Sequence, residues 1–110
     1  MVVDGVVTRR AGSSPLSWLT PLAAPIFHRI QARTRWLEGA RAAAKRSWHR
    51  ALAAAVKLDL PFEQAIARID LARTEPPGSG AREQHLDLAE GLCAAMGCRS
   101  ELAEIEALRA

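Results

Sequence analysis

The 110-residue sequence contains no tyrosine, only two phenylalanines and only seven glycines. Aromatic and β-branched residues, which favour strands, are scarce, whereas alanine, the best helix former, is abundant. The alternation of apolar and polar residues that marks a strand is absent, apart from a short pattern at Val2-Val3 and Val6-Val7. The sequence therefore argues against a sheet and predicts an all-α chain of one domain at most.

Cysteine and histidine are too few to suggest a metal site. The two cysteines, Cys93 and Cys98, stand five residues apart, and the histidines His28, His49 and His85 are scattered along the chain. A structural zinc site needs four ligands, usually in closely spaced pairs, and no such pair of motifs is present. Two cysteines at this spacing fall on different faces of a helix, so we expect two buried thiols without a disulfide, no metal and no cofactor.

The sequence lacks an apolar run long enough to cross a membrane, so we expect no membrane contact. Arg9 and Arg10 precede an apolar stretch at residues 15–25, but three prolines interrupt that stretch and no clean cleavage site follows. We therefore expect residues 1–21 to be poorly ordered, residues 22–110 to form the domain, and the protein to be cytoplasmic.

Motifs of enzymes are also absent. There is no glycine-rich phosphate loop, no Gly-x-Ser-x-Gly and no His-Glu-x-x-His. Glu83, Asp87 and Glu90 follow one another at spacings of three and four, which is typical of a solvated helix face rather than of paired catalytic carboxylates. The sequence predicts a protein that is not an enzyme.

Apolar residues recur at helical spacing in five segments, at about residues 22–38, 40–58, 62–73, 81–96 and 99–108. In the first segment, the residues expected to face the core are Ile26, Phe27, Ile30, Thr34 and Leu37. Short connections require successive helices to pack antiparallel. Two architectures fit this pattern, an open stack of helical hairpins and a small closed bundle.

The stretch Leu58-Asp59-Leu60-Pro61 separates the second predicted helix from the third. Leu60 precedes a proline and is therefore pushed out of the α region, which ends the helix. Pro61 suits the first turn of the next helix, where its missing N–H costs nothing, and Glu63 adds a favourable negative charge there. Gly97 is expected to end the fourth helix in a left-handed conformation.

An internal repeat appears when the sequence is shifted by 38 residues. The joint at residues 58–65 then falls on residues 96–103, and Trp48 and Ala51 fall on Leu86 and Ala89. Few residues are identical. The shared order is a long helix, a short break, a glutamate, an alanine and a second helix.

The triplet Ala44, Trp48 and Ala51 resembles the second helix of a tetratricopeptide repeat (TPR), in which a small, a bulky and a small residue let two helices approach closely. The copy 38 residues later keeps the last two of these positions but has Arg82 in place of the first small residue. Arg35 also occupies a position that is usually apolar, and the period is longer than the usual TPR period of about 34 residues.

A narrower resemblance covers residues 30–107. The joint at residues 58–65 and the segments around it are similar to the TPR-like C-terminal arm of large bacterial signalling ATPases, which are fused to kinase, cyclase or LuxR-type domains. That resemblance implies a non-catalytic bacterial interaction scaffold whose partner is a protein or a neighbouring domain, with self-association as a further option. The residues expected to pack its repeats are Ala44, Trp48, Ala51, Leu52, Pro61, Phe62, Ala65, Leu86 and Ala89.

Charge is distributed unevenly along the chain. Residues 1–57 contain ten Lys or Arg and two acids, and residues 58–110 contain five Arg and ten acids. The asymmetry fits neighbouring helices of opposite sign, and it also fits a basic nucleic-acid surface. The alternative function is therefore a small nucleic-acid-binding protein that uses Arg29, Arg33, Arg41, Lys45, Arg46 and Arg50. Acids in the helix after Pro61 would repel phosphate, so the scaffold hypothesis is favoured.

Overall fold

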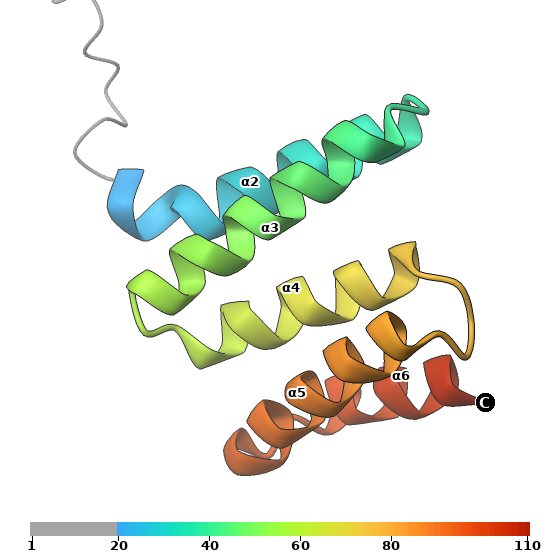
Figure 1. Cartoon of the computed structure of the whole chain (residues 1–110). Helices are drawn as coiled ribbons and strands as arrows, with labels where there is room; N and C mark the ends of the chain where they lie inside the picture. The colour runs from blue at the N-terminus through green and yellow to red at the C-terminus, as the bar shows by residue number, and fades with distance from the viewer. Residues whose placement is uncertain (1–19) are drawn as a thin grey trace, which may run out of the picture.

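A computed structural model describes residues 20–110, and these residues form five helices without a strand (Figure 1). The predicted all-α class is therefore confirmed. The predicted poorly ordered segment 1–21 lies outside the described residues, except that its last two residues already belong to the first helix. The helices are α2 (Thr20–Leu37), α3 (Arg41–Lys57), α4 (Pro61–Thr74), α5 (Gly80–Met96) and α6 (Arg99–Arg109).

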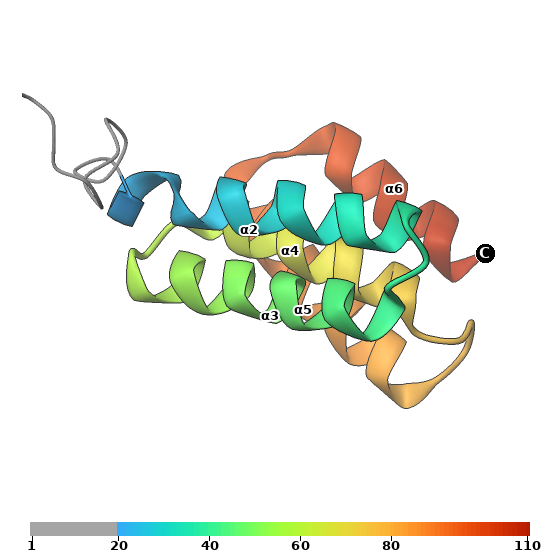
Figure 2. The same ribbon diagram turned by 90° about the horizontal axis from the view of Figure 1, so that it is seen from above.

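The helices form an open stack in chain order. Each helix packs on the next one, and α4 also touches both α2 and α6, but α2 contacts neither α5 nor α6. Figure 2 shows α2 and α6 on one side of the molecule and α3 and α5 on the other. Of the two architectures that the sequence left open, the contacts therefore describe a stack of hairpins rather than a closed bundle.

The same left-handed turn closes α2, α3 and α5. Gly39, Asp59 and Gly97 have φ angles of 86°, 54° and 72°. After Gly97, the N–H of Cys98 donates to the carbonyl of Cys93 at 3.0 Å, the bond that defines a Schellman motif. Asp59 and Gly97 are 38 residues apart, so the structural counterpart of Gly97 is Asp59. The sequence pattern assigns this break to Leu60 and Pro61, because a left-handed aspartate leaves no clear sequence signal.

Alanine lines the interfaces between the helices. In α3, the side chains of Ala44, Ala51 and Ala55 are fully or almost fully buried, and Trp48 between them is 6% exposed. A cluster of buried residues joins α4, α5 and α6. It consists of Ala65, Ile69, Ala72, Leu86, Ala89, Cys93 and Ile105. Small side chains at these positions allow the helix axes to approach closely.

The predicted core stripe of α2 is wrong. Phe27, Ile30 and Leu37 are 59%, 62% and 78% exposed, and Thr34 is exposed as well. The buried side of α2 instead carries Ala32 and the half-buried Trp36, which pack in a cluster with α3 and α4. The prediction failed because α2 has two apolar stripes on opposite faces, and the stripe with the larger residues does not face the core.

Arginines fill positions where the family pattern has small or apolar residues. Arg35 Nη1 donates to the hydroxyl of Ser47 at 2.8 Å, and Ser47 is fully buried between α2 and α3. Arg82 donates to two backbone carbonyls, of Glu75 at 3.2 Å and of Leu108 at 3.0 Å. These bonds satisfy carbonyls at the ends of α4 and α6, so the two departures from the pattern are structural contacts.

Cys93 and Cys98 lie side by side, contrary to the expectation that they occupy different faces. The expectation assumed one continuous helix, whereas α5 ends at Met96 and Gly97 turns the chain back. Both thiols are free, with Cys93 buried and Cys98 packed against its cluster. Burial, and then the neighbouring Cys98, raises the pKa of the Cys93 thiol.

A cluster of basic side chains connects α3, α4 and α5. Arg68 Nη1 lies 3.2 Å from His85 Nδ1, and a guanidinium can only donate, so this nitrogen accepts and the ring is neutral. The ring of His49 is 6.4 Å from that of His85, and Lys45 Nζ and the Glu75 carboxylate, 2.8 Å apart, complete the surroundings. Burial, followed by the charges of Arg68 and His49, lowers the pKa of His85.

The left-handed turn at Gly97 gives a first prediction. The substitution Gly97→Ala should lower the free energy of unfolding by about 1 kcal/mol, because an L-residue at this φ is strained. Gly91→Ala, in the interior of α5 with nothing within 4 Å of the added Cβ, is the matched control and should raise it by about 0.5–1 kcal/mol. Urea unfolding followed by circular dichroism measures both; a neutral or stabilising Gly97→Ala would contradict the assigned turn.

The Arg68–His85 contact gives a second prediction. The pKa of folded His85 is lower than that of the unfolded chain, so its contribution to stability is complete above about pH 6.5 and is lost as the pH falls. The variant His85→Gln keeps an acceptor oxygen for Arg68 but does not titrate. Between about pH 7.5 and about pH 5.5, the free energy of unfolding of the wild type should therefore decrease more than that of the variant. Equal decreases would contradict the assignment.

Candidate functional site

A groove lies between α2, α4 and α6, the three alternate helices of the stack. It encloses a hollow of about 540 Å³. Its walls are formed by Arg33, Trp36, Leu37, Trp48, Asp70, Arg73, Thr74 and Glu104. The groove exists because α2 and α6 do not touch, so the side chains of α4 and the indole of Trp48 form its floor.

A chain of polar contacts fixes the floor of the groove. The indole N–H of Trp48 donates to Asp70 Oδ2 at 3.0 Å, and Arg73 Nη1 donates to Asp70 Oδ1 at 3.0 Å. Arg73 Nη2 reaches Glu104 Oε2 at 2.5 Å, which ties α4 to α6. One network therefore holds side chains of α3, α4 and α6 in fixed orientations.

Asp70 is an acid of the groove whose carboxyl group has a shifted pKa. Burial raises the pKa of its carboxyl, and the charge of Arg73 and the N–H of Trp48 offset part of this rise. Both carboxylate oxygens already accept hydrogen bonds from the protein. The side chain is thus engaged in packing, and a raised pKa here has a structural cause.

The wall of the groove that α2 forms carries an aromatic ring and a cation. The ring centres of Trp36 and Trp48 lie 5.8 Å apart with the ring planes inclined at 59°, and the guanidinium of Arg41 lies 4.0 Å from the centre of the Trp36 ring. Arg33 is exposed on the same wall, and it makes no ion pair with an acid of residues 23–110. The groove therefore combines two indole rings, a hydrogen-bonded floor and an exposed cation.

The residues of the predicted basic surface have different surroundings. Arg29 pairs with Glu63 at 3.0 Å and Lys45 pairs with Glu75 at 2.8 Å, so two of the six cations are bound by acids of the second half. Arg41 lies over Trp36, and Arg33 borders the groove. The remaining two, Arg46 and Arg50, are exposed on α3.

The residues predicted to pack the repeats fall into two groups. Six of them are buried, namely Ala44, Trp48, Ala51, Ala65, Leu86 and Ala89. Leu52 is half-buried, Pro61 is exposed at the first position of α4, and Phe62 is 42% exposed beside it. Pro61 and Phe62 therefore shape the joint between α3 and α4 more than they fill the interface.

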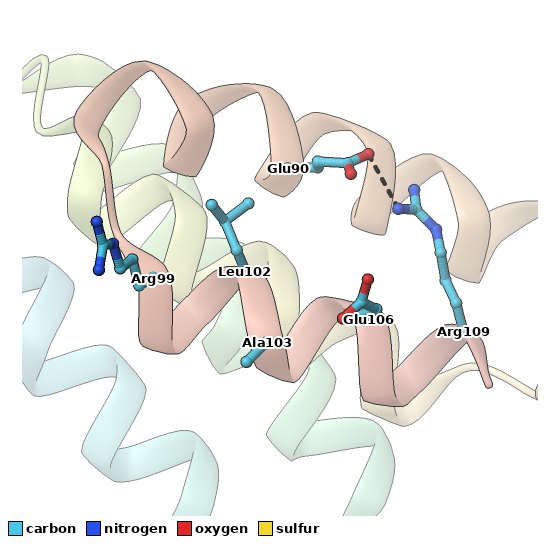
Figure 3. Close-up of a pocket in the computed structure, with 6 residues that line it drawn as sticks. All are labelled: Glu90, Arg99, Leu102, Ala103, Glu106 and Arg109. Atoms are coloured by element: carbon cyan, nitrogen blue, oxygen red, sulfur yellow. Dashed lines mark hydrogen bonds and ion pairs between the residues drawn. The ribbon is translucent and has the colours of Figure 1, made fainter.

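A second hollow of about 540 Å³ lies along α5 and α6, and Figure 3 shows its lining. Arg109 is its main feature, because this one guanidinium pairs with Glu83, with Asp87 and, at 2.9 Å, with Glu90. The three acids expected to form a solvated face thus converge on the last turn of α6. This one cation offsets only part of their negative charge, but the lining of the hollow contains two arginines and two glutamates and so has no excess of one sign.

Sequence reasoning missed Trp36, Asp70, Arg73 and Glu104 as groove residues. Asp70 and Arg73 stand at i and i+3 on one helix, a spacing that permits their ion pair. The contacts of Asp70 with Trp48 and of Arg73 with Glu104 bridge 22 and 31 residues, and no local pattern announces them.

Within residues 20–110, no group of three His, Cys, Asp or Glu side chains is placed to hold a metal ion. In the same part of the chain, no helix is both long and apolar enough to pass through a bilayer.

No protein-family model matches the chain, and no curated protein and no solved structure matches it significantly.

Proposed function

We propose that this chain is a non-catalytic protein-interaction module, and that the groove between α2, α4 and α6 holds a segment of a partner protein. The observation that carries the proposal is the pair of indoles, Trp36 and Trp48, in a hollow of about 540 Å³ that also carries the exposed Arg33. Indole rings and an exposed guanidinium are side chains that dominate protein–protein contacts.

The floor of the groove supports this proposal because it is already rigid. Asp70 and Arg73 are fixed by their bonds to Trp48 and Glu104, so a bound segment would meet oriented groups and would not have to order them. A hollow of this size accommodates a few side chains of an extended or helical segment.

The resemblance to TPR-like arms of bacterial signalling proteins agrees with this function. It suggests that the partner is a separate protein or a neighbouring domain, in the bacterial cytoplasm. The 38-residue spacing from Asp59 to Gly97, and from the start of α4 to the start of α6, supports a repeat architecture.

The third prediction tests the groove. Peptides selected from a random peptide library against the full chain should bind in the micromolar range, and Glu104→Arg should weaken their binding about tenfold or more. The substitution reverses an exposed charge on the groove wall and releases Arg73 from its partner. Isothermal titration calorimetry measures the dissociation constants.

Glu106→Arg is the matched control, since it makes the same change two residues further along α6, in the lining of the other hollow. The groove would be contradicted as the binding site if Glu104→Arg left the affinity of the selected peptides unchanged. It would also be contradicted if Glu104→Arg and Glu106→Arg weakened binding equally.

The alternative function is tested by measuring the binding of duplex DNA to the chain at two salt concentrations. Salt-sensitive micromolar binding that is abolished when Arg46→Glu and Arg50→Glu are combined would favour a nucleic-acid binder instead.

A further inference from the structure

The outer face of α2 carries a continuous apolar seam. Ala23, Phe27, Ile30, Thr34 and Leu37 follow one another at intervals of four, three, four and three residues, and all five are exposed. Alternating intervals of three and four residues define the a and d positions of a coiled coil, here a for Phe27 and Thr34 and d for the others. We call these five residues the α2 seam.

The remaining positions of α2 show that the seam points away from the body of the protein. The f positions of the same heptads are Pro25 and Ala32, and both are buried. Arg35, at a b position, bonds to Ser47 of α3, and Arg29, at a c position, bonds to Glu63 of α4. Helices α3 and α4 therefore cover the face opposite the seam and leave room for another helix along it.

Chemistry at the seam suits a dry interface. The Thr34 hydroxyl donates to the carbonyl of Ile30 at 3.0 Å, so its polar group is satisfied within α2 and its methyl group faces outward. A hollow of about 320 Å³ lies beside the seam and is lined mostly by apolar surface, including that of Phe27 and Ile30.

The charged residues beside the seam favour a second copy of α2 as the helix that packs on it. Arg33 stands at a g position. Glu38 takes the e position of the following heptad; it lies one residue beyond α2, but its N–H still donates to the carbonyl of Thr34 at 3.0 Å, as in a helix. In a parallel two-stranded coiled coil, a g residue of one helix meets the e residue five positions later on the other helix. Two copies of α2 in parallel would therefore place Arg33 of each copy against Glu38 of the other. An antiparallel pair would bring like charges together.

We propose that the α2 seam is a self-association surface that joins two copies of this chain as a parallel dimer, with reciprocal ion pairs between Arg33 and Glu38. Ile26, Phe27, Ile30 and Leu37 are 45–78% exposed. Burying these exposed parts in both copies removes roughly 1,000 Å² from water, which is near the lower limit for a specific interface. The expected dissociation constant is accordingly micromolar.

The exposed face of α6, at the opposite end of the stack, differs from the α2 seam. The exposed side of α6 carries Arg99, Ser100, Glu104 and Glu106 among small alanines, so the outer face of this helix is polar. It offers the seam no apolar stripe, so a head-to-tail contact from α2 to α6 of another copy is disfavoured. The two-fold arrangement uses one surface twice and closes upon itself.

Sedimentation equilibrium of the full chain, from about 5 to about 200 μM, is the fourth test. The wild type should pass from monomer to dimer in this range, and Ile30→Asp should raise the dissociation constant by at least tenfold without changing the helical content. Leu88→Asp is the control, because Leu88 is also an exposed aliphatic residue, 44% exposed against 62% for Ile30, but lies on α5; its variant should dimerise like the wild type.

A charge exchange tests the register. Arg33→Glu and Glu38→Arg should each weaken the dimer, and the double variant should restore it, since the exchange recreates both ion pairs. A dimer that Ile30→Asp leaves intact, or a double variant no better than the single ones, would overturn the proposal. A wild type that remains monomeric would overturn it too. In that case, a loss of thermal stability in Ile30→Asp would point to residues 1–19 as the cover of the seam, and unchanged stability to another protein.

Discussion

The close approach that alanine allows between helices is the constraint on which the rest of the structure depends. In the part of the chain that the structure describes, eight of the fourteen buried hydrophobic residues are alanines, and in α3 three of them recur along the side that faces α2 and α4. A methyl group removes little area from water, so each alanine contributes less by burial than a leucine would. The stack gains instead from close helix contacts, and its few large core residues are Trp48, Ile69, Leu71, Leu86 and Ile105.

A core built in this way depends on polar contacts to hold the helices in register. Arg35 with Ser47, Trp48 with Asp70, and Arg82 with the carbonyl of Leu108 each connect two elements. Removing one partner would leave a half-buried polar group without a bond, which costs more than the net value of the bond itself. These residues therefore specify the geometry of the groove as well as the stability of the fold.

The charge asymmetry has a similar origin. The first half of the chain supplies Arg29 and Lys45, and the second half supplies their partners Glu63 and Glu75. Both pairs cross from the α2–α3 hairpin to α4, so opposite charges in the two halves stabilise their contact. Such partly exposed pairs are individually weak, but they favour the native order of helices over other arrangements. Of the two interpretations of the charge asymmetry that the sequence allows, these pairs support neighbouring helices of opposite sign.

Sequence patterns predicted the elements well and the long-range contacts poorly. Helix periodicity, the proline at the start of α4 and the glycine after α5 fixed the helix boundaries to within about two residues. The pattern of Ala44, Trp48 and Ala51 also identified the buried face of α3. Three features could not be predicted from the sequence: the acidic partners of Arg109, the left-handed conformation of Asp59 and the contact between Cys93 and Cys98. Each depends on a turn or a long-range contact that helix periodicity does not encode.

The error on α2 is the most informative one. A helix with apolar residues on two opposite faces has no unique core side in its own sequence, and the choice is made by what the rest of the chain offers. Here the hairpin with α3 requires small residues, so Pro25 and Ala32 turn inward, while the larger Phe27, Ile30 and Leu37 remain outside. The same close packing that builds the interior thus places bulky apolar side chains on the surface. Because Leu37 belongs to the seam and also lines the groove, and Arg33 borders both, the two proposed contact surfaces share residues, and binding at one would be coupled to binding at the other.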